Sequence, residues 1–405
     1  MIAPGTRSAT LPVSDRRFPA LRRGPLNARR IYLDNACLTP APREVVETVT
    51  GFYEGIPGCP LRSESDSSGR LEQRIREARE AVRRFLNAKY SDEIVFTPNT
   101  TYGINLLASA FQDVPGRVLI SDLEHNSNRL PWLGHERLEL AWPPGQPFPL
   151  EEYRRALREN IKLVSITALS NVTGAAPPVR EIARAARAAG VPLHLDAAQA
   201  FPGGAIDVAD DLPEFVTFSF HKAYGPTGLG GLYIRRDWQG RLAPRMGGGG
   251  SVDDHHAETT TFTSGAPRFE FGLQNYAAIA AVPATMALLS SFSRADVAAH
   301  YGSLQAAFRA AVGATAGLRF IGPADAADAH HICTFTIEGA DPGRVAERLD
   351  LAARIHVRSG RLCAHHWFNR HRVPDVIRVS FGLHNTIEEI EDYARAQRSI
   401  LTHYL

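Results

Sequence analysis

The chain has 405 residues, of which 44% are hydrophobic and 22% charged, and its net charge at pH 7 is +2. That length allows two domains with a large core, and so small a net charge gives no reason to expect nucleic acid or a membrane surface as a partner. No apolar run approaches the ~20 residues of a membrane-spanning helix. The cysteines are widely spaced and form no disulfide framework, which favours a reducing cytoplasm: Cys37, Cys59, Cys333 and Cys363.

Residues 1–30 hold seven arginines and four prolines, and Asp15 is their only acid. The segment lacks the apolar core of a signal peptide, and its prolines oppose a long amphipathic helix. We interpret it as a flexible, arginine-rich arm that can lie on a partner subunit.

From residue 31 onward, apolar periodicity predicts strands that alternate with helices. In chain order we expect a strand at 31–33, helices at 43–54 and 68–86, a strand at 94–96, a helix through 104–111, strands at 118–121 and 163–169, a helix at 182–189, and strands at 192–196, 215–219 and 231–234. This alternation indicates an α/β fold with a mostly parallel sheet covered on both faces.

Residues 245–265 contain four consecutive glycines and predict a loop, which suits a lid or a subunit contact. A long alanine-rich helix is expected to start near residue 274 and to cross into an α+β domain with strands at 319–321, 332–337, 355–358 and 376–381 and helices at 345–349 and 387–404. We therefore expect a large domain over residues 31–275 and a small C-terminal domain over residues 276–405, with which residues 31–60 can also pack.

Polar residues follow the predicted strands at equivalent positions, and ligands of such sheets bind beyond the carboxyl ends of the strands. They are Thr100, His125, Asn171, Asp196, Ser219, His221 and Lys222. Lys222 is one of only three lysines and precedes a loop rich in Gly and Pro. A partly desolvated lysine acts as an imine-forming nucleophile or a base, although most loop lysines are simply solvated.

Four residues have both a functional and an ordinary interpretation. Thr100 and Thr101 stand where a helix starts, so they can bind phosphate or merely cap the helix. His125 offers a flat face for an aromatic ligand but can equally be a loop residue. Asp196 ends an apolar strand, where a buried carboxylate needs an arginine or a protonated ligand nitrogen. Together, an amine, an acid, a stacking face and phosphate donors are what pyridoxal phosphate requires.

The chain resembles fold-type I pyridoxal-phosphate enzymes of the class V aminotransferase family, in the cysteine desulfurase and selenocysteine lyase branch. The resemblance covers about residues 31–400. It is carried by Tyr32-Leu33-Asp34-Asn35-Ala36, Asn99-Thr100-Thr101 with Gly103-Ile104-Asn105, Glu124-His125, Ser170-Asn171, Asp196-Ala197-Ala198-Gln199, Ser219-Phe220-His221-Lys222 through Gly230, Arg268-Phe269-Glu270 and Arg378-Val379-Ser380. It implies a seven-stranded, mostly parallel sheet in the large domain, and a homodimer.

The resemblance also implies roles for individual residues. Lys222 would bind pyridoxal phosphate covalently and move protons, Asp196 would pair with the pyridine nitrogen, and Gln199 would bond the phenolic oxygen. His125 would stack on the ring and take part in catalysis. The phosphate would be held by Thr100 or Thr101, Ser219 and His221, and the substrate by Asn171, Arg358 and Arg378. No metal is expected.

Cys363 separates the branches of the family. The segment Arg358-Ser359-Gly360-Arg361-Leu362-Cys363-Ala364 resembles the desulfurase segment in which a cysteine thiolate takes the sulfur of L-cysteine, becomes a persulfide and leaves alanine. An acceptor protein or small molecule would then receive the sulfur. The nearby basic groups of Arg358, Arg361, His365 and His366 favour a thiolate.

Two alternatives stay open from the sequence. In the first, Cys363 is inert and the chain is a related C–S lyase, selenocysteine lyase, aminotransferase or epimerase. In the second, Cys363, His365, His366 and His371 bind a metal ion.

The chain departs from the family pattern at three places. Leu273 stands where relatives have a hydroxyl that the partner subunit lends to the phosphate, Cys37 replaces an alanine, and residues 365–371 are bulkier and more basic than expected.

Overall fold

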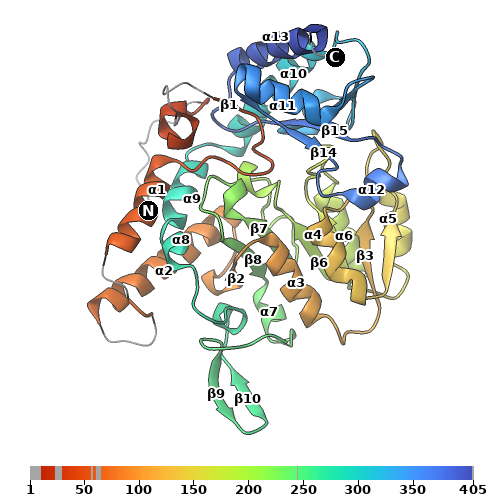
Figure 1. Cartoon of the computed structure of the whole chain (residues 1–405). Coiled ribbons are helices and arrows are strands. Elements are labelled where there is room, and N and C mark those ends of the chain that lie inside the picture. The colour runs from red at the N-terminus through yellow and green to blue at the C-terminus, as the bar shows by residue number, and fades with distance from the viewer. Residues whose placement is uncertain (1–10, 23–29, 56–57, 61–64, 244, 404–405) are drawn as a thin grey trace.

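The computed structural model describes residues 11–22, 30–55, 58–60, 65–243 and 245–403 (Figure 1). Its centre is a seven-stranded sheet in the order β2-β8-β7-β6-β5-β3-β4. Strand β8 is antiparallel to β2 and β7, and the other neighbouring strands are parallel to each other, which confirms the predicted mostly parallel α/β sheet. The strands are β2 Ile94–Thr97, β3 Arg117–Ser121, β4 Arg137–Leu140, β5 Ile161–Thr167, β6 Leu193–Asp196, β7 Phe215–Ser219 and β8 Gly230–Ile234.

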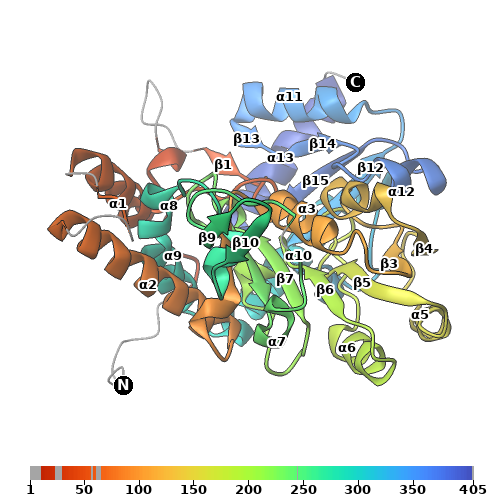
Figure 2. The same cartoon turned by 90° about the horizontal axis from the view of Figure 1, so that it is seen from below.

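The strands read as continuous apolar runs because both faces of the sheet are covered. Every residue of β2, β6, β7 and β8 is buried. The surrounding helices are α3 Thr100–Ala110, α4 Asn126–Arg129, α5 Leu150–Ala156, α6 Val179–Ala188 and α7 Arg236–Gln239. Figures 1 and 2 place four further helices together beside the sheet: α1 Arg43–Glu54, α2 Asp66–Leu86, α8 Tyr276–Ala280 and α9 Val282–Leu289.

The C-terminal part forms a second sheet in the order β11-β12-β15-β14, antiparallel throughout. Its strands are β11 Leu318–Phe320, β12 Ile332–Ile337, β14 Arg358–Gly360 and β15 Val376–Ser380, and its helices are α10 Arg294–Val312, α11 Pro342–Ala353 and α13 Ile387–His403. The segment around residue 31 joins this region, because β1 Ile31–Tyr32 pairs in parallel with β13 Ile355–His356.

Several sequence-based expectations were wrong. The long helix from residue 274 is three helices, α8, α9 and α10, because Pro283 starts a new turn and a Ser293–Asp296 capping box opens α10. The loop at 245–265 contains an exposed hairpin, β9 Val252–His256 and β10 Thr259–Phe262, which projects from the body (Figure 1). After Cys363 the chain forms helix α12 His365–Arg370, a stretch for which no secondary structure was predicted. Strand β4 and helix α5 were not predicted.

Part of the expected flexible arm is a packed element. Residues 11–22 contain two short 3-10 helices, Asp15–Arg17 and Pro19–Leu21, and the Phe18 side chain between them is fully buried. Val13 N–H donates to Leu383 O at 2.7 Å, which fastens the segment to the C-terminal region of its own chain. Residues 1–10 and 23–29 lie outside the described residues.

Over the described ranges, no single helix has the length and apolarity to cross a membrane. The segments Tyr276–Leu289 and Arg294–Val312 reach that length and apolarity only when they are taken together, and the chain bends by 75° between them. Their apolar side chains, such as Ile279, Leu288 and Phe308, are buried within the protein.

Candidate active site

A cavity of about 500 Å³ opens beyond the carboxyl ends of the strands of the large sheet. All the residues predicted for the site line it: Thr100, Thr101, His125, Asn171, Asp196, Gln199, Ser219, His221, Lys222, Arg358, Cys363 and Arg378. They come from both sheets and from loops more than 250 residues apart in the chain. The structure therefore brings the predicted site together in one place, while the role of each residue stays a prediction.

One end of the cavity is suited to an anion. The cap of α3 is Asn99, whose Oδ1 accepts from Tyr102 N at 2.9 Å, so the interpretation of Thr100 or Thr101 as the cap was wrong. Thr100 N donates to Ser219 Oγ at 2.8 Å, and the hydroxyls of these two residues are 2.7 Å apart. Hydroxyls at the positive end of a helix are the usual partners of a phosphate.

Asp196 ends β6 in a buried position. Its Oδ1 accepts from Ala198 N at 3.0 Å, and within the described part of the chain the carboxylate has no ion pair with a basic side chain. Burial raises the pKa of Asp196, while the positive charge of Lys222 acts in the opposite direction. Of the two partners expected from the sequence, an arginine is thus excluded for this part of the chain, and a protonated ligand nitrogen fits.

Lys222 follows β7 at the end of the short turn Phe220–Lys222. Burial lowers the pKa of its amine, which favours the neutral, nucleophilic form. His125 accepts from Ser127 N through Nδ1 at 3.0 Å, so the proton of the neutral ring is on Nε2. Burial, and next the charge of Lys222, lowers the pKa of His125 to about 3, so the ring is uncharged at neutral pH.

Gln199 is held from two sides. Its Nε2 donates to Ala36 O at 2.7 Å, which leaves Oε1 to face His331 Nε2 at 3.3 Å. His331 is buried, and burial lowers its pKa to about 3, so it donates as a neutral imidazole. His331 was not predicted, because a histidine next to an apolar strand is usually structural.

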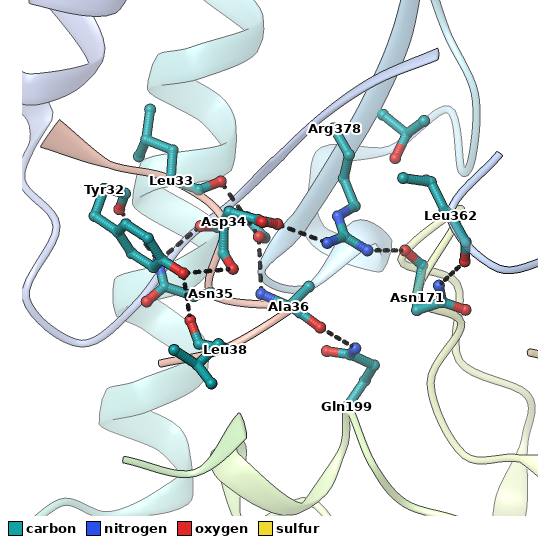
Figure 3. Close-up of polar contacts among 12 residues, drawn as sticks. Tyr32, Leu33, Asp34, Asn35, Ala36, Leu38, Asn171, Gln199, Leu362 and Arg378 are labelled. Atoms are coloured by element: carbon teal, nitrogen blue, oxygen red, sulfur yellow. Dashed lines mark hydrogen bonds and ion pairs between the residues drawn. The ribbon is translucent and has the colours of Figure 1, made fainter. Parts of the chain in front are cut away.

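Arg378 and Asn171 are engaged within the protein, as Figure 3 shows. Arg378 Nη2 pairs with Asp34 Oδ1 at 2.7 Å, and its Nη1 donates to Asn171 O at 3.1 Å. The Asn171 amide donates to Leu362 O at 2.7 Å. The Asp34 carboxylate was not predicted as part of the site, although Asp34 lies two residues after β1 and Asp196 similarly lies at the end of β6.

Cys363 is exposed and lies in a tight turn in which Leu362 and Cys363 have φ angles of 49° and 55°. Two consecutive non-glycine residues in this left-handed region are uncommon and strained, and such strain is concentrated at functional sites. The turn is held by the bond from Asn171 to Leu362 O and by Asn126 N, which donates to Cys363 O at 2.7 Å.

The basic groups near Cys363 are arranged differently from the prediction. Arg361 pairs with Asp375 at 3.1 Å and His366 pairs with Glu139 at 3.0 Å. Arg358, Arg361 and His365 line the cavity, whereas His366 does not. The metal alternative was wrong for the described residues, which contain no cluster of three potential ligands. The three histidines face different partners: His365 faces Asn126, His366 faces Glu139 and His371 faces Asp122.

Comparisons with known proteins agree with this geometry. The family profile aminotransferase class-V matches residues 31–393, and the chain belongs to this family. A cysteine desulfurase of Synechococcus elongatus is 32% identical over 397 residues, which are 96% of this chain and 63% of the relative, so the chain spans less than two thirds of that protein. A probable cysteine desulfurase of Methanothermobacter thermautotrophicus is 33% identical over 377 residues, 91% of this chain and 94% of the relative.

Solved structures are similar over nearly the whole chain. The cysteine desulfurase CsdA of Escherichia coli has a TM-score of 0.87 and 27% identity, with 96% of this chain and 97% of that chain covered. The apo cysteine desulfurase of Thermococcus onnurineus has a TM-score of 0.89 and 26% identity, with 96% and 100% covered.

The protein is thus a pyridoxal-phosphate-dependent enzyme of the class V aminotransferase family. The residues present fit that cofactor. Asp196 offers a buried carboxylate that has no ion pair with a basic side chain among the described residues, Thr100 and Ser219 offer hydroxyls at a helix N-terminus, and Lys222 offers a buried amine. When bound, such a cofactor would hold the amine of an amino-acid substrate and withdraw electrons from the carbon that bears this amine.

Proposed function

We propose that the protein is a cysteine desulfurase, which converts L-cysteine to L-alanine and leaves the sulfur on Cys363 as a persulfide for an acceptor protein or small molecule. The observation that carries this proposal is the turn at Leu362 and Cys363, which presents an exposed thiol to the cavity that also holds Lys222. The names of the relatives in the comparisons support it.

In this reaction, the residues of the cavity would bind the substrate, transfer protons and attack the sulfur. Arg378 and Asn171 would orient the substrate carboxylate, and Arg358 at the exposed mouth would add positive charge there. The Lys222 amine, whose pKa is lowered by burial, would accept and return protons at the substrate carbons. The Cys363 thiolate would attack the substrate sulfur, so that a sulfur–sulfur bond forms while the carbon–sulfur bond breaks.

The test compares wild type with Cys363→Ala in an assay of alanine and sulfide released from L-cysteine with a reductant. We expect Cys363→Ala to keep the visible absorbance of the bound cofactor and to lose alanine formation. Lys222→Ala should lose that absorbance, and Lys89→Ala, which replaces an exposed lysine, should keep it. Equal turnover by wild type and Cys363→Ala would contradict the role of Cys363 and favour one of the alternative class V reactions.

Location and assembly complete the proposal. We propose a cytoplasmic enzyme, which is supported by four free cysteines and the absence of any disulfide among them.

We also propose a homodimer without nucleic acid or membrane partners. The exposed hairpin β9–β10 and the Leu273 side chain, which is 81% exposed, support a subunit contact on that side of the molecule.

A further inference from the structure

The active-site cavity is lined by two cysteines, Cys363 and Cys37. The other two cysteines lie elsewhere, since Cys333 is buried in β12 and Cys59 lines a separate cavity. The reaction proposed above uses only Cys363, so Cys37 is a nucleophilic side chain in the site without an assigned role.

Cys37 is fixed by the backbone on both sides. Its own N–H donates to Asp34 O at 3.0 Å, and Ala36 is held by Gln199 at 2.7 Å. Two residues further on, Thr39 N donates to His221 O at 2.8 Å and Thr39 Oγ1 accepts from Tyr224 N at 2.6 Å. Thr39 is therefore bonded to the residues on both sides of Lys222, and Cys37 lines the same cavity as Lys222.

The turn that carries Cys363 is tied to the turn that carries Cys37. Asp34, at the start of the Cys37 turn, pairs with Arg378, and Arg378 donates to Asn171 O. Asn171 in turn bonds Leu362 O, directly before Cys363. Figure 3 shows this chain of contacts on either side of one buried guanidinium. The two cysteines thus belong to one rigid frame around the same space.

The electrostatics of Lys222 agree with this placement. Burial is the main influence and lowers the pKa of the amine. Asp196 raises it, and the negative charges of the two thiolates, Cys37 and Cys363, also raise it. Both sulfurs therefore lie close enough to the Lys222 amine to affect its charge, in agreement with their place in the same cavity.

We propose that Cys37 is a second sulfur carrier, which receives the outer sulfur of the Cys363 persulfide inside the cavity. This inference depends on the proposed function. The Cys37 thiolate attacks the outer sulfur, a bond forms between Cys37 Sγ and that sulfur, and the bond between Cys363 Sγ and that sulfur breaks. Cys363 leaves as a thiolate, ready for the next L-cysteine. The exchange conserves oxidation state and needs no oxidant or reductant.

The experiment maps persulfides on the holoenzyme after addition of limiting L-cysteine without reductant. Samples are alkylated at intervals, and the added sulfur is located by peptide mass spectrometry. In wild type we expect sulfur on Cys363 first and on Cys37 later. Cys37→Ala should carry it on Cys363 alone, Cys363→Ala on neither cysteine, and Cys59→Ala should behave as wild type.

A mixture of Cys363→Ala with Cys37→Ala tests whether the transfer stays within one chain. Sulfur should reach Cys37 in this mixture roughly tenfold or more slowly than in wild type, because a thiol in the same cavity has a far higher effective concentration. Transfer as fast in the mixture as in wild type, or sulfur on Cys37 of Cys363→Ala alone, would overturn the inference.

The two proposals fail in different ways. If the sulfur stays on Cys363 through repeated additions of L-cysteine and none is found on Cys37, Cys37 is not a second carrier, and the desulfurase proposal is unaffected. Alanine that forms without sulfur on either cysteine removes both proposals.

Discussion

At the scale of single residues, the site separates into groups that the sequence could predict and groups that it could not. Asp196 and Lys222 could be predicted because Asp196 is the last residue of a buried strand and Lys222 lies just beyond the end of another, where a charged side chain needs a partner or a function. The pairing of Arg378 with Asp34 could not, because it joins residues 344 positions apart through tertiary packing. The same holds for His331, whose importance depends only on its contact with Gln199.

His331 is expected to position Gln199 for the phenolic oxygen of the cofactor. In His331→Leu, Oε1 of Gln199 loses its donor, the amide is free to rotate, and the hydrogen bond to the phenolic oxygen weakens. The pH midpoint of the cofactor's visible band should then rise by up to about 1 unit, because one lost hydrogen bond of about 1 kcal/mol disfavours the charged oxygen.

Spectrophotometric titration of the holoenzyme measures this midpoint. His331→Gln, which retains a donor, should recover most of the wild-type value, and His255→Leu on the exposed hairpin serves as the control. An unchanged midpoint in His331→Leu would show that His331 only fills space.

Glu124 is expected to make stability depend on pH. The side chain is buried, and burial raises its pKa to about 7, although Ser121 and Asn128 donate to it at 2.6 and 2.7 Å. The unfolded chain releases this proton near pH 4.5, its ordinary value. Between these pH values the native state holds more protons than the unfolded state, so this group lowers the free energy of unfolding as pH rises.

Glu124→Gln should remove that decline, which is on the order of 3 kcal/mol between pH 4.5 and 7. Urea unfolding at several pH values across this window measures it, with Glu136→Gln as an exposed control. A variant whose stability falls with pH as steeply as that of wild type would contradict the assignment.

At the scale of elements, the sequence predicted those with regular apolar periodicity and missed those without it. Helix α2 and strands β2, β6 and β7 have buried side chains at the expected spacing. The hairpin β9–β10 has almost no buried residue, so its sequence carries no core-facing pattern. Helix α12 is held instead by tertiary contacts: Trp367 Nε1 donates to Trp142 O at 2.8 Å and His371 to Asp122 at 2.8 Å.

The packed N-terminal segment is expected to stabilise the region behind Lys222. The Phe18 ring contacts Tyr224 and His384, with ring centroids 5.7 and 5.2 Å apart. Tyr224 follows Lys222 by two residues and has a φ of 64°, so its position depends on such support. Phe18→Ala should lower the free energy of unfolding by about 3 kcal/mol, as expected for a large ring removed from a core.

Denaturant unfolding of Phe18→Ala against wild type measures this loss. Tyr53→Ala, which removes a side chain that is 72% exposed, should change stability little. Equal stability of Phe18→Ala and wild type would mean that residues 11–22 contribute little to the folded core.

At the scale of the whole molecule, the alternation of strands and helices was enough to predict the sheet and its polar edge, because parallel strands place all their carboxyl ends on one side. It was not enough to predict how the two sheets meet. That junction is made by Asp34, Arg378 and Asn171, which connect the start of the chain, strand β15 and the loop after β5. The cavity therefore depends on contacts between regions with no common periodic pattern.

The proposed homodimer is expected to use the side of the molecule that carries Leu273. Leu273 is 81% exposed and lines a cavity of about 410 Å³ together with residues of α2 and α8. The exposed hairpin β9–β10 precedes it in the sequence. An interface on this side would bury Leu273, and an aspartate there would replace apolar contact with an unpaired charge. Leu273→Asp should thus weaken association by more than about tenfold in Kd, which corresponds to about 1.4 kcal/mol.

Sedimentation velocity over a concentration series distinguishes one 44.3 kDa chain from two. Wild type should sediment as the dimer, and Leu273→Asp should dissociate at concentrations where wild type does not. Leu351→Asp changes a leucine that is 69% exposed on α11 and should leave the dimer intact. A monomeric wild type with cofactor bound would refute the dimer, and equal weakening by both substitutions would move the interface away from Leu273.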